Sequence, residues 1–346
     1  MSFTALNTTK DLDIISDLKL QSENRLLFST WSNEIYLYSC QEYLQASQSS
    51  HIEPPKLSPL QVIKTDNSTP LSLLYHPSYQ KSIVGALDGT ISEIDYENNK
   101  LNTIVKNTED TNNGVNKLCN IANNLIISSS FNGLLRLIDV RTHDIISQYK
   151  KEGKIFNIES NNEFKVIVTR SKNQLEIYDS RKGLASPIEI REVGLKYQIK
   201  DLKICNSDNN KFAISTIDGR VSIEYLNELN LDQRFTFKCH RTQDKITNTD
   251  LVYPVNSICF QNENYLYTGG SDGYVCLWDC GKKTRLKQFP QFRTQDNDIE
   301  SISKIEINND GNLLVVGTSD DSYYRNRRLS QSEDSKNPSK VYIKSI

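Results

Sequence analysis

Short runs of β-branched, aliphatic and aromatic residues, each about the length of a strand, recur along the chain between polar turns. The clearest example lies at residues 268–279, where Asp272-Gly273 separates two such runs. An Asp-Gly pair in this context is a strong signal for a β-hairpin, because both central turn positions favour positive φ. Trp278-Asp279 at the end of the second run is typical of a propeller-blade repeat. Because one blade cannot bury its own faces, the pattern predicts a ring of blades.

Six degenerate copies of this hairpin recur at spacings of about 40 to 55 residues, near the period of propeller repeats. Their turns lie at Trp31-Ser32-Asn33, Leu87-Asp88-Gly89, Phe131-Asn132-Gly133, Lys172-Asn173, Ile217-Asp218-Gly219 and Ser319-Asp320-Asp321. Together the seven copies predict an all-β protein, a single seven-bladed β-propeller of WD repeats that occupies residues 1–346. The predicted blades cover about 12–40, 69–98, 114–149, 153–182, 196–240, 252–289 and 299–346.

The two ends of the chain are expected to meet in the last blade. Its final strand, residues 341–346, needs an outer partner, and residues 3–6 near the N-terminus are the obvious candidate. Their pairing would close the ring and remove exposed sheet edges. Residues 320–338 interrupt this blade with a stretch rich in Ser, Arg, Asp and Asn, which predicts a mobile surface loop.

Composition and charge narrow the class of protein. A formal net charge of −2 excludes bulk polyanion binding as the main driving force, so any charged ligand must meet a local patch. No apolar span of 18 residues predicts a membrane helix, and the first residues lack the basic and apolar regions of a secretory signal. The seven cysteines are scattered and odd in number, which predicts reduced core thiols in a soluble cytosolic or nuclear protein.

No catalytic constellation stands out. The four histidines lie far apart, and Cys276 and Cys280 flank Trp278 at a strand end rather than forming a zinc motif. No nucleophile elbow and no phosphate loop occurs in the chain. The sequence therefore predicts a binding scaffold that is not an enzyme and that carries no metal and no cofactor.

Basic residues gather at the strand ends of the fifth predicted blade. Lys200 opens its first strand, Arg220 opens the third, and Lys238 and Arg241 lie where the fourth ends. In an antiparallel blade these positions share one face, and the third and fourth strands lie roughly 4.8 Å apart. Arg220 and Lys238 could therefore clamp a phosphate through charge-assisted hydrogen bonds. The alternative is that these side chains are ordinary solvated charges at the rim.

The same face should carry Trp31 and Phe131, each at the turn between the second and third strands of its blade. An aromatic side chain at a turn covers a large apolar area, which favours burial by a partner. The alternative is packing against the adjacent blade. Trp278 lies inside a strand and is expected to be structural.

Several longer strings resemble one propeller family. They are Gly194-Leu-Lys-Tyr-Gln-Ile-Lys200, Ile217-Asp-Gly-Arg-Val221, Phe237-Lys-Cys-His-Arg241, Tyr253-Pro-Val-Asn256 and Gly269-Gly-Ser-Asp-Gly273. In this order they resemble the Bub-type WD-repeat propellers of the mitotic spindle checkpoint, and also their sisters, the messenger-RNA export propellers. The resemblance is strongest over residues 190–290 and looser elsewhere. Tyr253-Pro-Val-Asn256 is similar to the checkpoint branch, whereas the export branch has Tyr-Ala-Val-Asn and a longer N-terminal extension.

The resemblance implies a nuclear adaptor that acts at the kinetochore in mitosis. Its expected partners are GLEBS motifs in the checkpoint kinase and its pseudokinase-like relative, and phosphorylated Met-Glu-Leu-Thr repeats of the kinetochore scaffold. Residue by residue, Arg220 and Lys238, with Arg241 beside them, match the phosphothreonine site, while Lys200, Trp31 and Phe131 match the GLEBS site. No direct nucleic acid, no membrane and no self-association are expected, so the protein would be a monomeric propeller in hetero-complexes.

The chain departs from the family pattern at two turns, and one alternative function is compatible with the sequence. The family has Trp-Asp-Gly at the turns of the first and third blades, whereas this chain has Trp31-Ser-Asn33 and Phe131-Asn-Gly133. These changes affect the expected GLEBS footprint more than the phosphate clamp. The alternative function is that of a messenger-RNA export factor that docks a nucleoporin GLEBS motif and contacts RNA through a basic face.

Overall fold

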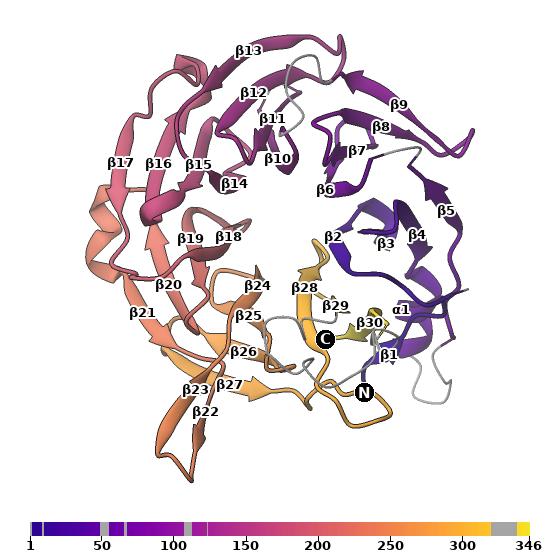
Figure 1. Cartoon of the computed structure of the whole chain (residues 1–346), viewed down its shortest axis with the longest axis vertical. Coiled ribbons are helices and arrows are strands. Elements are labelled where there is room, and N and C mark those ends of the chain that lie inside the picture. The colour runs from indigo at the N-terminus through magenta and orange to yellow at the C-terminus, as the bar shows by residue number, and fades with distance from the viewer. Residues whose placement is uncertain are drawn as a thin grey trace.

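Seven antiparallel sheets of four strands each stand around a central axis in the computed structural model, with one further two-stranded hairpin at the rim (Figure 1). The structure describes residues 2–8, 10–48, 55–65, 68–106, 113–122, 124–319 and 338–346. The predicted all-β, seven-bladed propeller is confirmed. The predicted mobile loop at 320–338 lies outside the described residues, apart from Pro338.

In blades 1 to 6 the first strand of the sheet lies nearest the axis and the fourth lies at the rim, with the strands in sequence order (Figure 1). Blade 1 comprises β2 Ile15–Leu20, β3 Arg25–Thr30, β4 Glu34–Ser39 and β5 Gln61–Lys64. Blade 2 comprises β6 Pro70–His76, β7 Lys81–Ala86, β8 Ile91–Asp95 and β9 Lys100–Val105. Blade 3 comprises β10 Val115–Ile121, β11 Leu125–Ser130, β12 Leu134–Asp139 and β13 Ile145–Lys150. Blade 4 comprises β14 Ile155–Ser160, β15 Lys165–Arg170, β16 Gln174–Asp179 and β17 Glu189–Glu192. Blade 5 comprises β18 Ile199–Cys205, β19 Asp208–Thr216, β20 Arg220–Tyr225 and β21 Phe235–Lys238. Blade 6 comprises β24 Val255–Phe260, β25 Tyr265–Gly270, β26 Val275–Asp279 and β27 Thr284–Gln288. Blade 7 comprises β28 Ser301–Ile307, β29 Leu313–Ser319, β30 Lys340–Ser345 and β1 Thr4–Ala5.

Three of the predicted blade limits end too early. The fourth strands β5, β9 and β17 lie wholly beyond the predicted ends at residues 40, 98 and 182. In blade 1 the helix α1 (Gln41–Gln48) and the segment after it separate β4 from β5. Outer strands bury little, so their sequences carry no strong apolar alternation from which to predict them.

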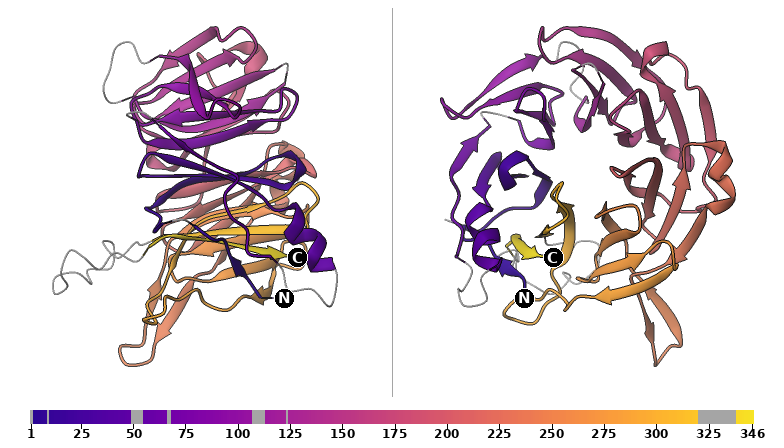
Figure 2. Two further views of the ribbon diagram at one scale, coloured as in Figure 1. Left: turned by 90° about the vertical axis from the view of Figure 1, so that its right-hand side faces the viewer. Right: turned by 180° about the vertical axis from the view of Figure 1, so that it is seen from behind.

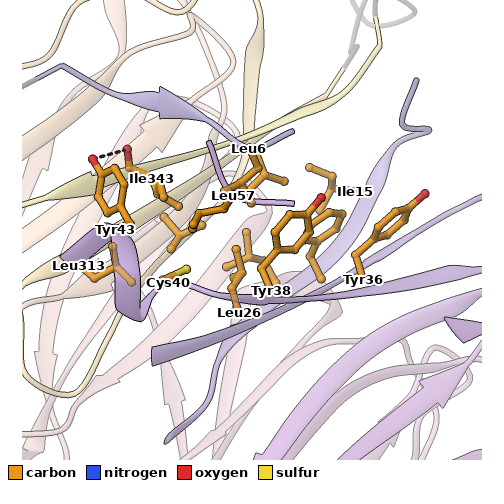
Figure 3. Packing of buried hydrophobic residues seen from close by; sticks show 14 of the residues in the cluster. Leu6, Ile15, Leu26, Tyr36, Tyr38, Cys40, Tyr43, Leu57, Leu313 and Ile343 are labelled. Carbon is orange, nitrogen blue, oxygen red and sulfur yellow. Dashed lines mark hydrogen bonds between the residues drawn. The ribbon is translucent and has the colours of Figure 1, made fainter. Parts of the chain in front are cut away.

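The ring closes between the first and last strands of the chain, as predicted. Thr4 pairs with Ile343 and Ala5 with Tyr342, so β1 becomes the fourth strand of blade 7. Beside this junction a buried cluster joins blades 1 and 7, and Tyr43 of α1 donates a hydrogen bond to the Ile343 carbonyl (Figure 3). The N-terminal strand therefore takes the edge of β30 that would otherwise be exposed.

The blades present two different faces. The top face, as we name it, carries the turns between second and third strands, and also the hairpin of β22 (Arg241–Asp244) and β23 (Thr249–Val252). The bottom face carries α1. Figure 2 shows the hairpin and α1 on opposite sides of the disc in its left panel.

The hairpin turns differ from the expected type. Gly89, Gly133, Gly219 and Gly273 all adopt positive φ, between 68° and 90°, but the Asp or Asn before each does not. At these four turns the expectation that both central residues take positive φ is therefore wrong, whereas Lys172 and Asn173 in blade 4 do both adopt positive φ, 70° and 58°. Asn33 takes the place of the glycine in blade 1 with φ of 62°. Asparagine tolerates this region better than most residues, which explains how blade 1 turns without glycine.

A buried hydrogen-bond network holds blade 6 together. His240 Nδ1 lies 2.8 Å from Asp272 Oδ1, and its Nε2 lies 2.8 Å from Thr268 Oγ1. Trp278 Nε1 donates to the same Thr268 hydroxyl at 3.0 Å, so Trp278 has the structural role expected for it. A Cβ atom at Gly270 would lie 2.3 Å from His240 Nδ1, which is why this position requires glycine.

Candidate functional site

Arg220 and Lys238 lie directly opposite each other on the top edge of blade 5, in register across β20 and β21. The Arg220 Nε donates to Asp218 Oδ2 at 2.7 Å, which orients the guanidinium. Among the described residues, neither the two terminal nitrogens of Arg220 nor the Lys238 ammonium has a hydrogen-bond partner or carboxylate. The pair therefore presents a guanidinium fork and an ammonium that are free to bind an anion.

Arg241 lies beside this pair but is already engaged. One terminal nitrogen lies within hydrogen-bond distance of the backbone carbonyls of Asp218 and Gly219, at 3.3 and 3.4 Å. The other lies 3.4 Å from Asp250 in the adjacent hairpin strand. Arg241 thus braces the turn that carries Arg220, and its charge adds to the local positive potential.

Lys200 extends this row of charges toward the axis. It follows Ile199 at a register shift in the innermost strand β18, and its side chain is exposed. Its backbone carbonyl accepts a hydrogen bond from Asn157 of blade 4 at 3.2 Å, which fixes the strand end. Lys200, Arg220 and Lys238 therefore span blade 5 from the channel to the rim.

Exposed apolar side chains accompany the charges on the top face. Trp31 and Phe131 follow β3 and β11 directly, and they are 47% and 43% exposed. Their backbone N–H groups donate to the carbonyls of Ile14 and Gly114, at the start of the first strand of the same blade. These bonds fix the turns that carry the two aromatic residues, and the exposure of both side chains shows that neither packs fully against a neighbouring blade.

Sequence reasoning missed four further members of this apolar set. They precede a first strand or follow a second strand, and all are between 38% and 53% exposed: Ile14, Leu87, Tyr197 and Ile217. The signal was the position itself, since the residue after each second strand is equivalent in every blade. Together with Trp31 and Phe131 they make six side chains, which we call the apolar ring. Asp218 was also missed as the partner of Arg220, although the Asp-Gly turn placed it two residues away.

The bottom mouth of the central channel forms a cavity with a volume of about 630 Å³. Its charges pair with one another across the channel: Lys304 lies 3.5 Å from Asp17, and Glu306 lies 3.7 Å from Lys203. Burial by itself would raise the pKa of Asp17, but Lys117 and Lys304 hold it well below its usual range. Because the channel charges neutralise each other, the top face remains the better candidate for an anionic ligand.

The cysteines offer no reactive thiolate. All seven are described, buried and free of disulfides. Burial raises the pKa of the Cys280 thiol to about 11 and that of Cys276 to about 12. Both thiols are therefore protonated near neutral pH and behave as small apolar residues.

The chain is similar in sequence to known WD-repeat proteins. Residues 232–279, which include the hairpin and most of blade 6, match the family model described as WD domain, G-beta repeat. The spindle assembly checkpoint protein bub3 of Schizosaccharomyces pombe is 31% identical over 303 residues, which cover 86% of this chain and 84% of the relative. This chain belongs to the Bub3 family. The resemblance noted in the sequence is thereby confirmed.

Other members and relatives of the Bub3 family match shorter parts of the chain. The mitotic checkpoint protein bub-3 of Caenorhabditis elegans is 30% identical over 206 residues, 58% of this chain and 57% of the relative. The messenger-RNA export factor rae-1 of the same organism is 34% identical over 128 residues, 35% of this chain and 34% of the relative.

A solved structure supports the fold. A chain in a crystal structure of a mitotic checkpoint complex superposes with a TM-score of 0.65 at 14% identity, covering 91% of this chain and 90% of that chain. At this identity the similarity speaks for the propeller architecture alone. In the described part of the chain, no helix is long and apolar enough to cross a membrane.

Proposed function

We propose that this Bub3-family protein is a non-enzymatic adaptor of the spindle assembly checkpoint. It binds GLEBS motifs of checkpoint kinases on its top face, and it binds phosphorylated Met-Glu-Leu-Thr repeats of the kinetochore scaffold beside them. By doing so it recruits the checkpoint machinery to kinetochores, and the protein itself is nuclear and lies at kinetochores in mitosis. The observation that carries the proposal is the Arg220–Lys238 pair beside an exposed apolar ring, since the terminal nitrogens of Arg220 and the ammonium of Lys238 have no partner among the described residues.

The Arg220–Lys238 pair fits a phosphothreonine. A phosphate ester carries about −1.5 to −2 charges at neutral pH and offers three acceptor oxygens. Asp218 holds the Arg220 guanidinium through Nε alone, so the two terminal nitrogens can form a fork toward one phosphate. Lys238, opposite in register, supplies a mobile ammonium to a further oxygen. An unphosphorylated threonine would leave these donors without a charged acceptor.

The apolar ring and Lys200 fit a GLEBS segment. Trp31, Phe131 and their four companions provide apolar area around the channel mouth that a bound peptide would remove from water. Lys200 is exposed on the innermost strand of blade 5, on the same face as this area, where it can meet acidic residues of the segment. The ring thus supplies affinity, and Lys200 sets the orientation of the peptide.

Calorimetric titration with a Met-Glu-Leu-Thr peptide, phosphorylated and unphosphorylated, tests the clamp in the GLEBS-loaded protein. The phosphopeptide should bind, and Arg220→Ala should weaken binding at least tenfold, since each charge-assisted hydrogen bond contributes about 1.5–3 kcal/mol. Lys238→Ala should act in the same direction. Equal binding of both peptides, or an unaffected Arg220→Ala protein, would refute the phospho-reader function.

Arg141→Ala is a matched control for the loss of an arginine. Arg141 also pairs with an aspartate two residues earlier, Asp139, at 3.0 Å, but it lies after β12 on the bottom face. Its loss should leave phosphopeptide affinity unchanged. A comparable loss in both variants would mean that net charge, rather than the Arg220 site, determines binding.

The similarity to the export factor rae-1 supports one alternative function, docking of a nucleoporin GLEBS motif with contacts to RNA. That relative aligns with about a third of the chain, whereas the fission-yeast checkpoint protein aligns with most of it. Phosphate-independent peptide binding together with strongly salt-dependent RNA binding would favour the export function.

A further inference from the structure

The outer strand of blade 6, β27, is the most open strand in the blades. It pairs with β26 on one side only, and all five of its residues are exposed. Every other fourth strand in the described part of the propeller contains at least one partly or fully buried residue. Its outer row of backbone N–H and C=O groups therefore has no partner within the sheet.

The open strand and the turn that leads into it are also strongly basic. Lys282, Lys283, Arg285 and Lys287 fall within six consecutive positions. Among the described residues, no carboxylate lies within 4.0 Å of Lys283, Arg285 or Lys287, and Lys282 meets Asp279 at 3.9 Å. An edge strand with this much uncompensated charge is well protected against pairing with itself, and it attracts chains of opposite charge.

Two of these cations are held in place by aromatic rings. Lys283 Nζ lies 4.8 Å from the centre of the Phe235 ring, and Lys287 Nζ lies 4.8 Å from that of Phe289. The pKa of Lys344 is lowered, mainly by burial and to a smaller extent by repulsion from the positive charge of Lys287. The cation–π contacts thus hold Lys283 and Lys287 at defined positions beside the edge, where an approaching anion would be favourable.

A bulge distributes the charges to both sides of the strand. Arg285 pairs with Trp278, whereas Lys287 pairs with the preceding residue, Leu277. Trp278 packs in the cluster that contains Val221 and Val255, and Leu277 packs in the cluster of blade 7. Arg285 therefore leans toward blade 5 and Lys287 toward blade 7, so that cations flank the free edge on either side.

We propose that the free edge of β27 binds an acidic peptide in extended conformation, which adds a fifth strand to blade 6. The peptide backbone would pair with the unpartnered edge, and its carboxylates would meet Lys283, Arg285 and Lys287. Successive side chains of a strand project to opposite faces, so adjacent acidic residues can meet Arg285 on the side of blade 5 and Lys287 on the side of blade 7. The partner is thus a segment rich in Glu or Asp with no helix-forming requirement.

This edge is separate from the clamp of the proposed function. Val221 and Phe237 pack between blades 5 and 6, so their neighbours along the strands, Arg220 and Lys238, lie on the opposite side, toward blade 4. The edge of β27 lies at the rim of the next blade (Figure 1). The proposal therefore does not depend on the phospho-reader function.

Nucleic acid is the other polyanion that could meet these cations. The edge favours a peptide, because a phosphodiester chain has no N–H groups for the free carbonyls of β27. A nucleic-acid surface also commonly presents aromatic faces for base stacking, whereas here Lys283 and Lys287 cover the Phe235 and Phe289 rings.

Fluorescence anisotropy at low salt tests the proposal with a labelled octapeptide, Glu-Glu-Thr-Val-Glu-Glu-Thr-Val, which is blocked at both ends and carries glutamates on both faces of an extended strand. The full-length protein should bind it, and the triple variant Lys283→Gln, Arg285→Gln, Lys287→Gln should bind about tenfold more weakly, as expected for three partly exposed ion pairs. A control variant with the same loss of charge at exposed rim positions, Lys100→Gln, Lys106→Gln, Lys150→Gln, should bind like wild type. Amide hydrogen exchange should slow in β27 when the peptide is present.

Three outcomes would overturn the proposal. One is equal binding of a peptide with the same charges but N-methylated at alternate amides, since such a peptide has lost the N–H groups for strand pairing. Another is equal weakening by the triple and the control variants, which would show a non-specific charge effect. A third is tighter binding of a uridine 20-mer than of the acidic peptide, lost in the triple variant, which would assign the surface to RNA.

Discussion

Replacement of the Thr268 hydroxyl should destabilise blade 6 far more than its size suggests. Thr268 is fully buried and serves both Trp278 Nε1 and His240 Nε2. We assign the hydroxyl proton to His240 Nε2 and the other imidazole proton to Asp272, because this arrangement satisfies every polar atom in the network. Thr268→Val keeps the shape and removes the hydroxyl, which leaves a buried imidazole nitrogen and an indole N–H without partners.

The expected loss follows from the two orphaned groups. An unsatisfied buried polar group costs about 1–3 kcal/mol, and the Trp278 indole is only partly buried, so the sum is about 2–4 kcal/mol. Thr268→Ser keeps the hydroxyl and removes one methyl group, which costs about 1 kcal/mol. The assay is urea unfolding followed by Trp278 fluorescence in a Trp31→Phe background, which leaves one tryptophan in the chain.

The comparison between the two variants is decisive. Thr268→Val should unfold at clearly lower urea than Thr268→Ser, with a similar slope of free energy against denaturant. If the valine variant is as stable as the serine variant, the hydroxyl does not hold the network. In that case the shape of the side chain, which valine retains, would stabilise blade 6, and the hydrogen bonds of the hydroxyl would not.

Three further predictions concern packing, charge and ring closure. Gly270→Ala places a methyl group against His240 and should lower stability by about 2 kcal/mol or more, measured by thermal unfolding, whereas Gly194→Ala, with no atom within 4 Å, should be neutral. Asp17 has a lowered pKa when folded, so its contribution to stability is fully present above its unfolded pKa of 3.8 and is lost progressively as the pH falls from 3.8 toward the folded pKa. Asp17→Asn should therefore lower the urea midpoint more at pH 7 than at pH 3; a constant difference would contradict this. Deletion of residues 2–6 removes β1 and should lower the thermal midpoint and promote aggregation in light scattering, unless another segment covers the edge of β30.

The sequence predicted the architecture because turns and inner strands carry local signals. The repeated Asp-Gly and Asn-Gly turns need a left-handed residue at a fixed place, and Gly89, Gly133, Gly219 and Gly273 supply it. Apolar strands between these turns require a ring, since a single blade leaves both faces exposed. The same local reasoning failed for the outer strands β5, β9 and β17, whose largely exposed residues carry no period that selects strand over loop.

The sequence likewise predicted one part of the candidate site and not another. Strand order alone predicted that Arg220 and Lys238 would share one edge, because they open and close adjacent antiparallel strands. It did not predict that the Arg241 guanidinium would be occupied by the carbonyls of Asp218 and Gly219, because that contact depends on the path of the β22–β23 hairpin.

By itself, then, the sequence determined the repeat, the ring and the residues at each strand end, since all of these follow from interactions between neighbours in the chain. Only the tertiary structure decided which of those residues are available to a ligand. Leu87 and Tyr197 come from different blades and join one apolar ring because the closed propeller brings their strand ends to the same face. Lys283 and Lys287 are left without carboxylates because the blade that carries them places them at the rim, beyond the reach of acidic groups elsewhere in the described chain. Availability depends on what surrounds a side chain in space, and those surroundings are fixed only when the ring closes.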